Sequence, residues 1–304
     1  MSGDSADREF HCGSVALVGW TNVGKSTLLN RLVGVRIAAV GGAAQTTRQR
    51  ITGVLNLPLG QIVVVDTPGL HRPRSRMNRA MVELSRRAIQ DVDLVLLLVD
   101  AERGLGPGDR EAAELLARAN TGRLLVLNKI DRVRPKSKLL PLMRTGVEEW
   151  GFSEALPISA LTGEGCATLI ERILPHLPRS PRLFDEEYLT DQTERAIVAE
   201  KIREKLLNLT DAELPHATAV LIERWHERPD GLLEIQATIL VDRESQKPIV
   251  IGRGGELAKR VGTEARLDIE EFLGRRVFLQ LWVKVRRDWR DDERTLQELG
   301  LRGG

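Results

Sequence analysis

Cysteine, long apolar runs and aromatic residues are all scarce in this sequence of 304 residues. Its two cysteines, Cys12 and Cys166, lie far apart and outside any CxxC spacing, which excludes a disulfide framework or a cysteine-based zinc site and suits a reducing compartment. The longest apolar run, Leu94 to Val99, falls well short of the roughly 18 to 20 residues that cross a bilayer. We therefore expect a cytoplasmic protein without a transmembrane helix.

The few aromatic residues, five Trp, five Phe and one Tyr, disfavour RNA-binding modules that stack bases on exposed rings. Net charge gives as little direction, because 45 Lys and Arg against 43 Asp and Glu leave only +2. Any nucleic-acid site must therefore be a local patch. The polar segment 1–12 lacks the basic start and apolar stretch of a secretory signal, and we expect a short disordered tail there.

In the first half of the chain, short apolar segments alternate with helical patterns. Strands that are apolar throughout are buried on both faces, as in a parallel sheet with helices on both sides. The pattern predicts an α/β domain over residues 13–176. Its expected strands are Ser14 to Gly19, Gln61 to Asp66, Leu94 to Asp100, Leu124 to Asn128 and Leu156 to Ser159.

Three prolines, Pro175, Pro178 and Pro181, mark a domain boundary, since such a stretch forms neither a helix nor a central strand. We place a linker at residues 177–188. Over residues 189–304, a helical pattern at 198–209 precedes alternating strands at 233–241 and 277–285, with a further helical stretch from about 255 to 273. This half is expected to be α+β with a small sheet.

The segment from Gly19 to Ser26 fits the pattern GxxxxGK[ST], and it follows an apolar strand and opens an apolar helix, Thr27 to Val33. In such a loop, backbone N–H groups curl around phosphate oxygens, Lys25 reaches the β and γ phosphates, and Ser26 gives its hydroxyl to Mg²⁺. The flanking elements argue against a chance glycine-rich turn. The expected nucleotide-binding residues here are Gly19, Asn22, Val23, Gly24, Lys25, Ser26 and Thr27.

Asp66-Thr67-Pro68-Gly69 ends the next strong strand. There the carboxylate of Asp66 can reach Mg²⁺, and the amide of Gly69 can sense a γ-phosphate. A DxxG tetrapeptide is common, and alone it could be a strand-terminal turn. Its position after the phosphate-binding loop favours the functional interpretation.

Asn128-Lys129-Ile130-Asp131 follows the strand Leu124 to Leu127. The carboxylate of Asp131 can accept both N–H protons on the N1 and N2 edge of guanine, a donor pair that adenine lacks, so this motif selects GTP over ATP. Ser159-Ala160 ends the last expected strand and fits the backbone element that contacts the guanine oxygen. Such a dipeptide alone is nearly uninformative.

In the second half, Ile251-Gly252-Arg253-Gly254-Gly255 supplies an I-G-x-x-G loop between two helical segments. KH domains use such a loop to clamp about four nucleotides of single-stranded RNA, because its glycines let phosphates approach the chain. A helix cap is the alternative, but the order helix, two strands, helix, loop, helix, strand favours a type II KH domain. Ten basic and six acidic residues from Arg253 to Arg290 suit phosphate contacts, although Lys259 and Arg260 could equally belong to a solvated helix face.

The elements GxxxxGKS, DxxG, NKxD and SA, in this order and each at a strand end, resemble the translation-factor-related class of small GTPases. The resemblance implies a threonine that closes over Mg²⁺, for which Thr47 is favoured and Thr46 is the alternative. Leu70 stands where Ras-like enzymes carry a water-orienting glutamine, so slow intrinsic hydrolysis is expected. Asn22 is then a candidate to hold K⁺ beside the phosphates, unless it merely occupies a left-handed turn. The expected catalytic residues are Lys25, Thr47, Gly69 and Asn22, and the expected Mg²⁺ ligands are Ser26, Thr47 and Asp66.

A GTPase domain followed by a type II KH domain is similar to the bacterial Era GTPases over nearly the whole chain. The most specific matches are Glu213-Leu214-Pro215 and Leu281-Trp282-Val283-Lys284-Val285, beside Gln45-Thr46-Thr47-Arg48 and the extension of DxxG by Leu70-His71. Trp20-Thr21 departs from this family, which usually has Arg-Pro there. The departure puts local packing in doubt rather than activity, because neither side chain is a phosphate ligand.

The resemblance implies an α/β P-loop GTPase domain with a mostly parallel sheet, joined to an α+β type II KH domain. It further implies a Mg²⁺-dependent GTPase that binds the single-stranded 3′ end of 16S ribosomal RNA and acts in assembly of the small (30S) ribosomal subunit. A monomer is expected, and a weak peripheral membrane contact stays open. One rival is a constitutive RNA-binding protein with a structural nucleotide domain, against which the intact GTPase motifs argue. The other, an ATP-dependent kinase, would lack the NKxD motif.

Overall fold

The structure is a computed structural model that describes residues 10–41, 47–69, 75–119, 121–210 and 218–301. The chain forms two compact units. Unit 1 comprises residues 1–37, 47–72 and 82–191, and unit 2 comprises residues 38–46, 73–81 and 192–304. Unit 2 thus takes in two short segments from the first half of the chain, and the domain boundaries expected from the sequence stay a prediction. No helix in the described part of the chain is long and apolar enough to span a membrane.

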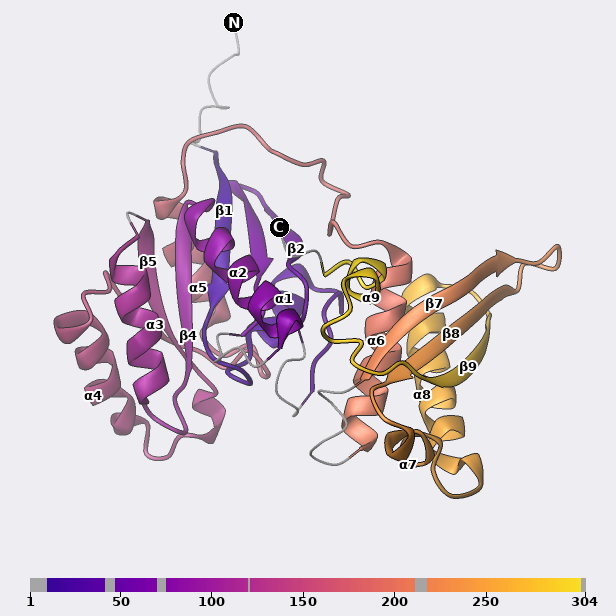
Figure 1. The fold of residues 1–304 in the computed structure, drawn as a ribbon. Helices are drawn as coiled ribbons and strands as arrows, with labels where there is room; N and C mark the ends of the chain where they lie inside the picture. The colour runs from indigo at the N-terminus through magenta and orange to yellow at the C-terminus, as the bar shows by residue number, and fades with distance from the viewer. Residues whose placement is uncertain (1–9, 42–46, 70–74, 120, 211–217, 302–304) are drawn as a thin grey trace, which may run out of the picture. The chain divides into compact units, whose positions relative to one another are not determined.

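Unit 1 is built on a six-stranded sheet in the order β2-β3-β1-β4-β5-β6 (Figure 1). Five of the strands run parallel, and β2 pairs antiparallel with β3. The expected α/β fold with a mostly parallel sheet is therefore confirmed. The strands are β1 (His11–Val18), β2 (Ile51–Leu57), β3 (Gly60–Asp66), β4 (Leu94–Asp100), β5 (Gly122–Asn128) and β6 (Ala155–Pro157).

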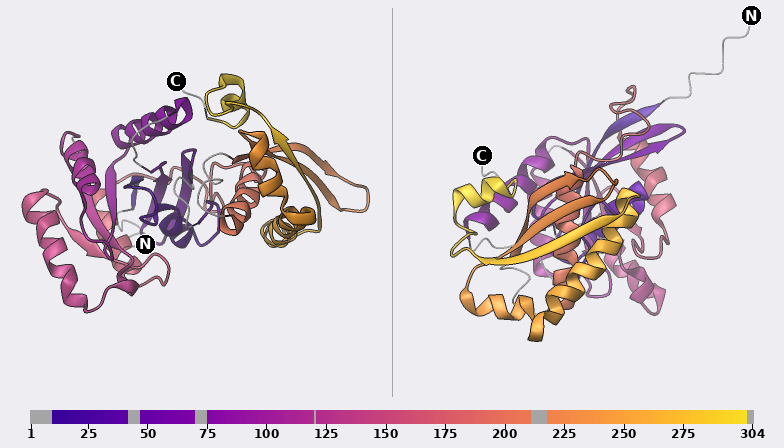
Figure 2. Two further views of the ribbon diagram at one scale, coloured as in Figure 1. Left: turned by 60° about the horizontal axis from the view of Figure 1, so that its bottom comes forward. Right: turned by 90° about the vertical axis from the view of Figure 1, so that its right-hand side faces the viewer.

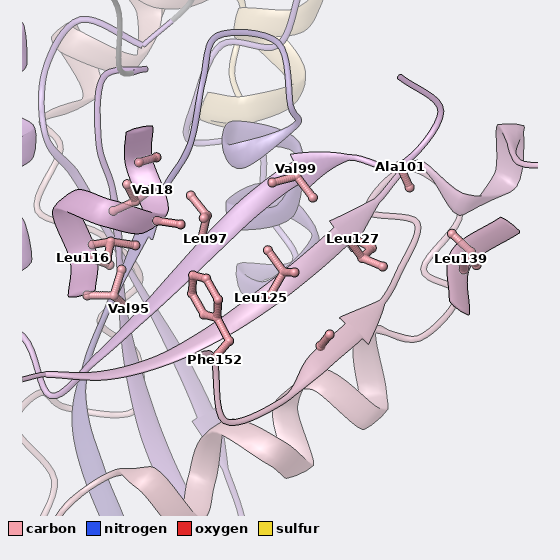
Figure 3. Close-up of a cluster of buried hydrophobic side chains, with 14 of the residues drawn as sticks. Val18, Val95, Leu97, Val99, Ala101, Leu116, Leu125, Leu127, Leu139 and Phe152 are labelled. Carbon is pink, nitrogen blue, oxygen red and sulfur yellow. The ribbon is translucent and has the colours of Figure 1, made fainter. Parts of the chain in front are cut away.

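Apolar side chains bury both faces of the central strands. On one face, Val95, Leu97 and Val99 of β4 pack with the β5 side chains and with Phe152 (Figure 3). The alternate positions of β4 are equally buried, since Leu94, Leu96 and Leu98 are 0% exposed. A strand covered on both faces must be apolar at every position, which accounts for the uninterrupted run in the sequence. The helices of this half are α1 (Lys25–Val33), α2 (Arg76–Gln90), α3 (Pro107–Ala117), α4 (Leu139–Arg144) and α5 (Cys166–Ile173).

The sheet differs from the sequence analysis at the start of β1 and in one additional strand. β1 begins at His11, inside the segment 1–12 assigned to a disordered tail, and Cys12 is 1% exposed. The backbone N–H of His11 donates to Leu59 O at 3.1 Å, so residues 11 and 12 are paired rather than loose, while residues 1–9 lie outside the described residues. The sequence pattern also misses β2, because Gly53 and Asn56 interrupt its apolar run and its pairing comes from a hairpin with β3.

The expected linker is bound to unit 1 by hydrogen bonds. Gln61, fully buried on β3, accepts from the backbone N–H groups of Leu183 (2.9 Å) and Phe184 (3.0 Å) and donates to Phe184 O (2.8 Å). Val54 N donates to Leu189 O at 2.8 Å. The segment's backbone groups are thus satisfied by the sheet edge, which fixes a stretch whose composition alone favours an extended linker.

Unit 2 contains a three-stranded sheet of β7 (Thr218–Glu227), β8 (Leu233–Val241) and β9 (Val277–Val285). β7 and β8 are antiparallel, whereas β8 and β9 are parallel. α6 (Glu194–Leu209) and α8 (Glu256–Leu273) pack on one face of the sheet, and α7 (Lys247–Ile251) precedes the glycine loop (Figure 2). The element order confirms the expected α+β arrangement of a type II KH domain.

The opposite face of the unit 2 sheet is covered at one end. There Ala219 of β7 and Leu240 of β8 pack with Trp289, which is completely buried, and with Leu296 of α9 (Glu293–Glu298). At the other end of the same face, Phe278 and Trp282 of β9 are exposed.

Candidate functional site

The loop between β1 and α1 leads into the N-terminus of α1. Gly24 has a φ of +100°, and a Cβ there would lie 2.2 Å from Nδ2 of Asn128, so only glycine fits. α1 begins at the next residue, with Thr27 in its first turn, and a helix N-terminus attracts anions. Asn22 has a φ of +64°. This is the left-handed turn that is the alternative to K⁺ binding for this residue. This loop therefore has the form of a phosphate cradle.

Lys25 is folded back onto this loop. Its Nζ donates to Gly19 O at 3.1 Å and to Trp20 O at 2.9 Å, and its side chain is buried. Burial lowers the pKa of Lys25 to about 8, although the nearby carboxylate of Asp66 opposes the shift. Because these two hydrogen bonds of the ammonium go to backbone carbonyls, it can exchange them for bonds to phosphate oxygens.

Three oxygen-bearing side chains from separate segments meet beside Lys25. The hydroxyls of Ser26 and Thr47 lie 2.6 Å apart, and they donate to Asp66 Oδ2 at 2.7 Å and 3.0 Å, respectively. Asp66 is 0% exposed, and burial raises the pKa of its carboxyl, against the lowering effects of Lys25 and the two hydroxyls. Its Oδ1 is buried and has no hydrogen-bond partner among the described residues. Hard oxygen ligands with one unsatisfied carboxylate oxygen fit Mg²⁺.

Asn128 joins the phosphate loop to the last loop of the site. Its Nδ2 donates to Val23 O at 2.7 Å, and its Oδ1 accepts from Ala160 N at 2.9 Å. Ser159 is fully buried, and its hydroxyl accepts from Thr162 N at 3.1 Å. The structure thus brings together the NKxD and Ser-Ala motifs, which are separated by about thirty residues, through one buried amide.

Asp131 is oriented differently from Asn128. One of its oxygens, Oδ1, is buried and has no hydrogen-bond partner within the described ranges, while the side chain as a whole is 22% exposed. This is the state expected of a carboxylate that accepts from a ligand rather than from the protein.

Sequence reasoning misses Asp100, the last residue of β4. Its Oδ2 accepts from Lys129 Nζ at 2.6 Å, and the carboxylate is 6% exposed. Asp100 therefore fixes the lysine that stands between Asn128 and Asp131. The available signal was its place at a strand end, the same place that Asp66 and Asn128 occupy.

Trp20 and Thr21, which depart from the pattern of the family that the sequence resembles, pack against glycines. A Cβ on Gly108 would lie 2.2 Å from Cε2 of Trp20, and a Cβ on Gly69 would lie 2.9 Å from Cγ2 of Thr21. The large ring is thus accommodated because α3 presents a glycine to it. Gly69 in turn brings the DxxG segment against the phosphate loop.

The glycine loop of unit 2 separates Ile251, the end of α7, from the start of α8. Gly252 has a φ of +78°, and a Cβ there would lie 2.8 Å from Leu257 N, so this position requires glycine. Around Gly254 and Gly255, by contrast, a Cβ would meet open space. The loop is therefore accessible to a phosphate backbone.

The basic residues from Arg253 to Arg290 divide into two groups. Arg253, Lys259, Arg276 and Arg287 are exposed and form no ion pair with another described residue. The remaining charge density is largely neutralised within the protein. Ion pairs with carboxylates involve Arg260, Arg266, Arg275, Lys284, Arg286 and Arg290.

Several residues singled out in the sequence lie outside the described residues. They are Gln45, Thr46, Leu70, His71 and Glu213-Leu214-Pro215.

Comparisons with known proteins agree across both units. A family profile of 50S ribosome-binding GTPases matches residues 14–129, and a KH domain profile matches residues 213–290. GTPase Era of Geobacter metallireducens is 47% identical over 296 residues, which cover 97% of this chain and 99% of that protein. GTPase Era of Caldanaerobacter subterraneus subsp. tengcongensis is 44% identical over 292 residues, or 96% of this chain and 98% of that protein.

Two solved structures are similar throughout. One is Era in complex with MgGDPNP and nucleotides 1506–1542 of 16S ribosomal RNA, and the other is an Era variant of Aquifex aeolicus bound to GDP and AlF4⁻. Each has 38% sequence identity and a TM-score of 0.93, and covers 96% of this chain and 99% of the other. Because similarity at this level extends through both units, the chain belongs to the Era GTPase family and is an enzyme that hydrolyses GTP to GDP and phosphate.

Proposed function

We propose that this GTPase is a Mg²⁺-dependent switch that binds the single-stranded 3′ end of 16S ribosomal RNA through its KH domain, in the cytoplasm, during assembly of the small ribosomal subunit. The observation that carries the proposal is the coexistence of an intact nucleotide site with an accessible glycine loop. A purely structural nucleotide domain would not need a buried lysine, three converging oxygens and a base-selective carboxylate.

The oxygen set supports the Mg²⁺ part of the proposal. Ser26, Thr47 and Asp66 would hold the ion, which when bound neutralises charge that develops on the phosphate oxygens. Lys25 would turn from the loop carbonyls to the same phosphates, and Gly69 would offer its backbone N–H to the γ-phosphate. These positions support the catalytic roles expected for Lys25, Thr47 and Gly69.

The RNA part rests on the glycine loop and on a relative. Arg253 and Lys259 are exposed beside open glycines, which suits contact with a phosphate backbone. A related Era structure with a TM-score of 0.93 contains a segment of 16S ribosomal RNA.

Crosslinking and sequencing of RNA tests the proposal as a whole. The GTP-loaded protein should crosslink to the 3′ end of 16S ribosomal RNA, and the Lys25→Ala variant, which cannot be loaded, should lose this enrichment. Equal enrichment in both proteins would favour the rival, a constitutive RNA-binding protein. Crosslinks spread over unrelated RNA would contradict the proposed target.

Thr47→Val should abolish most Mg²⁺-stimulated hydrolysis, because it removes a hydroxyl 3.0 Å from Asp66 while keeping the side-chain shape. Loss of metal stabilisation, several kcal/mol, corresponds to a fall in rate on the order of 10³. The measurement is single-turnover hydrolysis during titration with Mg²⁺ after treatment with EDTA. Thr46→Val is the matched control and should retain activity. If Thr46→Val loses hydrolysis and Thr47→Val retains it, Thr46 is the ligand.

Hydrolysis should also require K⁺, because Asn22 lies in the phosphate loop and Leu70 cannot orient water. A cation beside the phosphates would supply charge that other GTPases obtain from an arginine finger, so we expect a rate about tenfold higher in KCl than in NaCl at equal ionic strength. Asn22→Ala should remove the difference. Equal wild-type rates in both salts would show that the cation has no role.

A further inference from the structure

The exposed end of the unit 2 sheet face carries two aromatic side chains. Phe278 is 40% exposed and Trp282 is 57% exposed, and no other aromatic side chain in the described ranges is classed as exposed. Both belong to β9, where they pair with Glu234 and Thr238 of β8, so they share one face. Trp282 follows Phe278 by four positions along the strand, a distance of about 13 Å. Such exposure is costly for large rings unless a partner covers them.

Cations surround these rings. The guanidinium of Arg228 lies 5.3 Å from the centroid of the Phe278 ring. Arg224 and Lys284 have side chains that are 51% and 63% exposed, and their register places both on this face. Lys284 pairs with Glu223 at 3.6 Å, so the three cations on this face stand against two carboxylates, those of Glu223 and Glu234.

The more buried of these two carboxylates, Glu234, pairs with two arginines. Glu234 has a side chain only 10% exposed, and it binds Arg228 at 3.0 Å and Arg224 at 3.6 Å. These arginines also lower the pKa of its carboxyl, with the hydrogen bond from Arg228 as the largest cause. The exposed end of the face thus presents rings and positive charge to a ligand.

Exposed rings beside cations fit single-stranded nucleic acid, because every base has a π-face that stacks on an aromatic ring and every phosphate attracts a cation. Gln280 lies between the two rings and pairs across with Gln236. Their amides can donate to or accept from base edges. The face therefore offers stacking, charge and hydrogen bonding together.

The strand that carries this face, β9, also contacts α7 and α8, the two helices that flank the glycine loop, which pack on the opposite face of the sheet. The loop clamps about four nucleotides, whereas the RNA in the related Era complex extends from nucleotide 1506 to 1542. Most of an RNA of that length must lie outside the clamp.

We propose that Phe278 and Trp282, with Arg224, Arg228 and Lys284, form a second RNA site that stacks unpaired bases outside the segment held by the glycine loop. The inference rests on the proposed function, because it takes the same RNA as ligand. It assigns a role to the Leu281-to-Val285 segment, which the nucleotide and glycine-loop motifs leave unexplained.

Affinity measurements with two RNAs test this site. One RNA spans nucleotides 1506–1542 of 16S ribosomal RNA, and the other is a short RNA that covers only the clamp. Phe278→Ala and Trp282→Ala should each bind the long RNA about 5- to 100-fold more weakly, as base–aromatic stacking predicts, and should bind the short RNA like wild type. Trp282→Phe should recover most of the affinity. Leu140→Ala, which removes another exposed apolar side chain (65%), is the control and should change nothing.

Ultraviolet crosslinking of the long RNA, followed by mass spectrometry, should place crosslinks on Phe278 or Trp282. Circular dichroism would establish that each variant is folded, which is expected because both side chains are exposed. Folded alanine variants that bind the long RNA as tightly as wild type would overturn the site and leave the face to a protein partner. If wild type itself fails to bind the long RNA, the proposed function fails and this site with it.

Discussion

Asp131→Asn should weaken GTP binding on the order of 10² to 10⁴ and create affinity for xanthosine triphosphate. The buried Oδ1 of Asp131 has no hydrogen-bond partner in the described part of the protein, so it is free to accept from guanine. Each hydrogen bond to a charged group contributes about 1.5 to 3 kcal/mol, and an amide nitrogen would face guanine's donors instead. Xanthine carries an oxygen at the 2-position, which can accept from that new amide.

Titration with both nucleotides measures this exchange. Asp91→Asn makes the same chemical change at an exposed position of unit 1 and should leave both affinities unchanged. A folded Asp131→Asn variant with wild-type affinity for GTP would show that base selection lies elsewhere.

Replacing both Arg253 and Gly254 by Asp should abolish RNA binding while GTP hydrolysis survives. Carboxylates would then stand where phosphates must approach, and repulsion at close range should lower affinity on the order of 100-fold or more. The variant should fold, because Gly254 has a φ of +60° with open space around it, and Asp tolerates the left-handed region better than most residues.

The measurement is affinity for single-stranded RNA across a salt series, with circular dichroism as the test of folding. For wild type, the logarithm of affinity should fall with the logarithm of salt by roughly 0.7 per phosphate contact, and the slope should decrease in the double variant. A control variant, Lys138→Asp with Gly104→Asp, introduces the same charge change in unit 1, where Gly104 also has positive φ and open space. Tight RNA binding by the folded variant with Asp at positions 253 and 254 would show that the loop only connects two helices.

The local sequence pattern was sufficient to predict an element wherever the burial of its faces decides which consecutive residues are apolar. β4 is apolar at every position because both of its faces are covered, and β8 and β9 alternate because one face of their sheet is covered by α6 and α8. The motif loops follow from the same logic, since Asp66 and Asn128 are the last residues of buried strands that end at one edge of a mostly parallel sheet.

Contacts between distant segments could not be predicted in this way. The sequence left Thr46 and Thr47 as alternatives, and only the fold brings the Thr47 hydroxyl to Asp66 and Ser26. The partnership of Asp100 with Lys129 likewise depends on neighbouring strands.

The number of unpaired charges was the property that could least be predicted from the sequence. The sequence shows a basic stretch from Arg253 to Arg290, yet Arg290 pairs with Asp242 and Arg286 with Glu298. The conformation of the linker likewise depends on a distant partner. The buried amide of Gln61, more than a hundred residues earlier, forms hydrogen bonds with Leu183 and Phe184. The sequence by itself therefore determined most of the elements, the motifs and the family resemblance, since these depend on neighbouring residues. Tertiary structure decided which polar groups are neutralised and which remain for a ligand, because that depends on partners brought together only by folding.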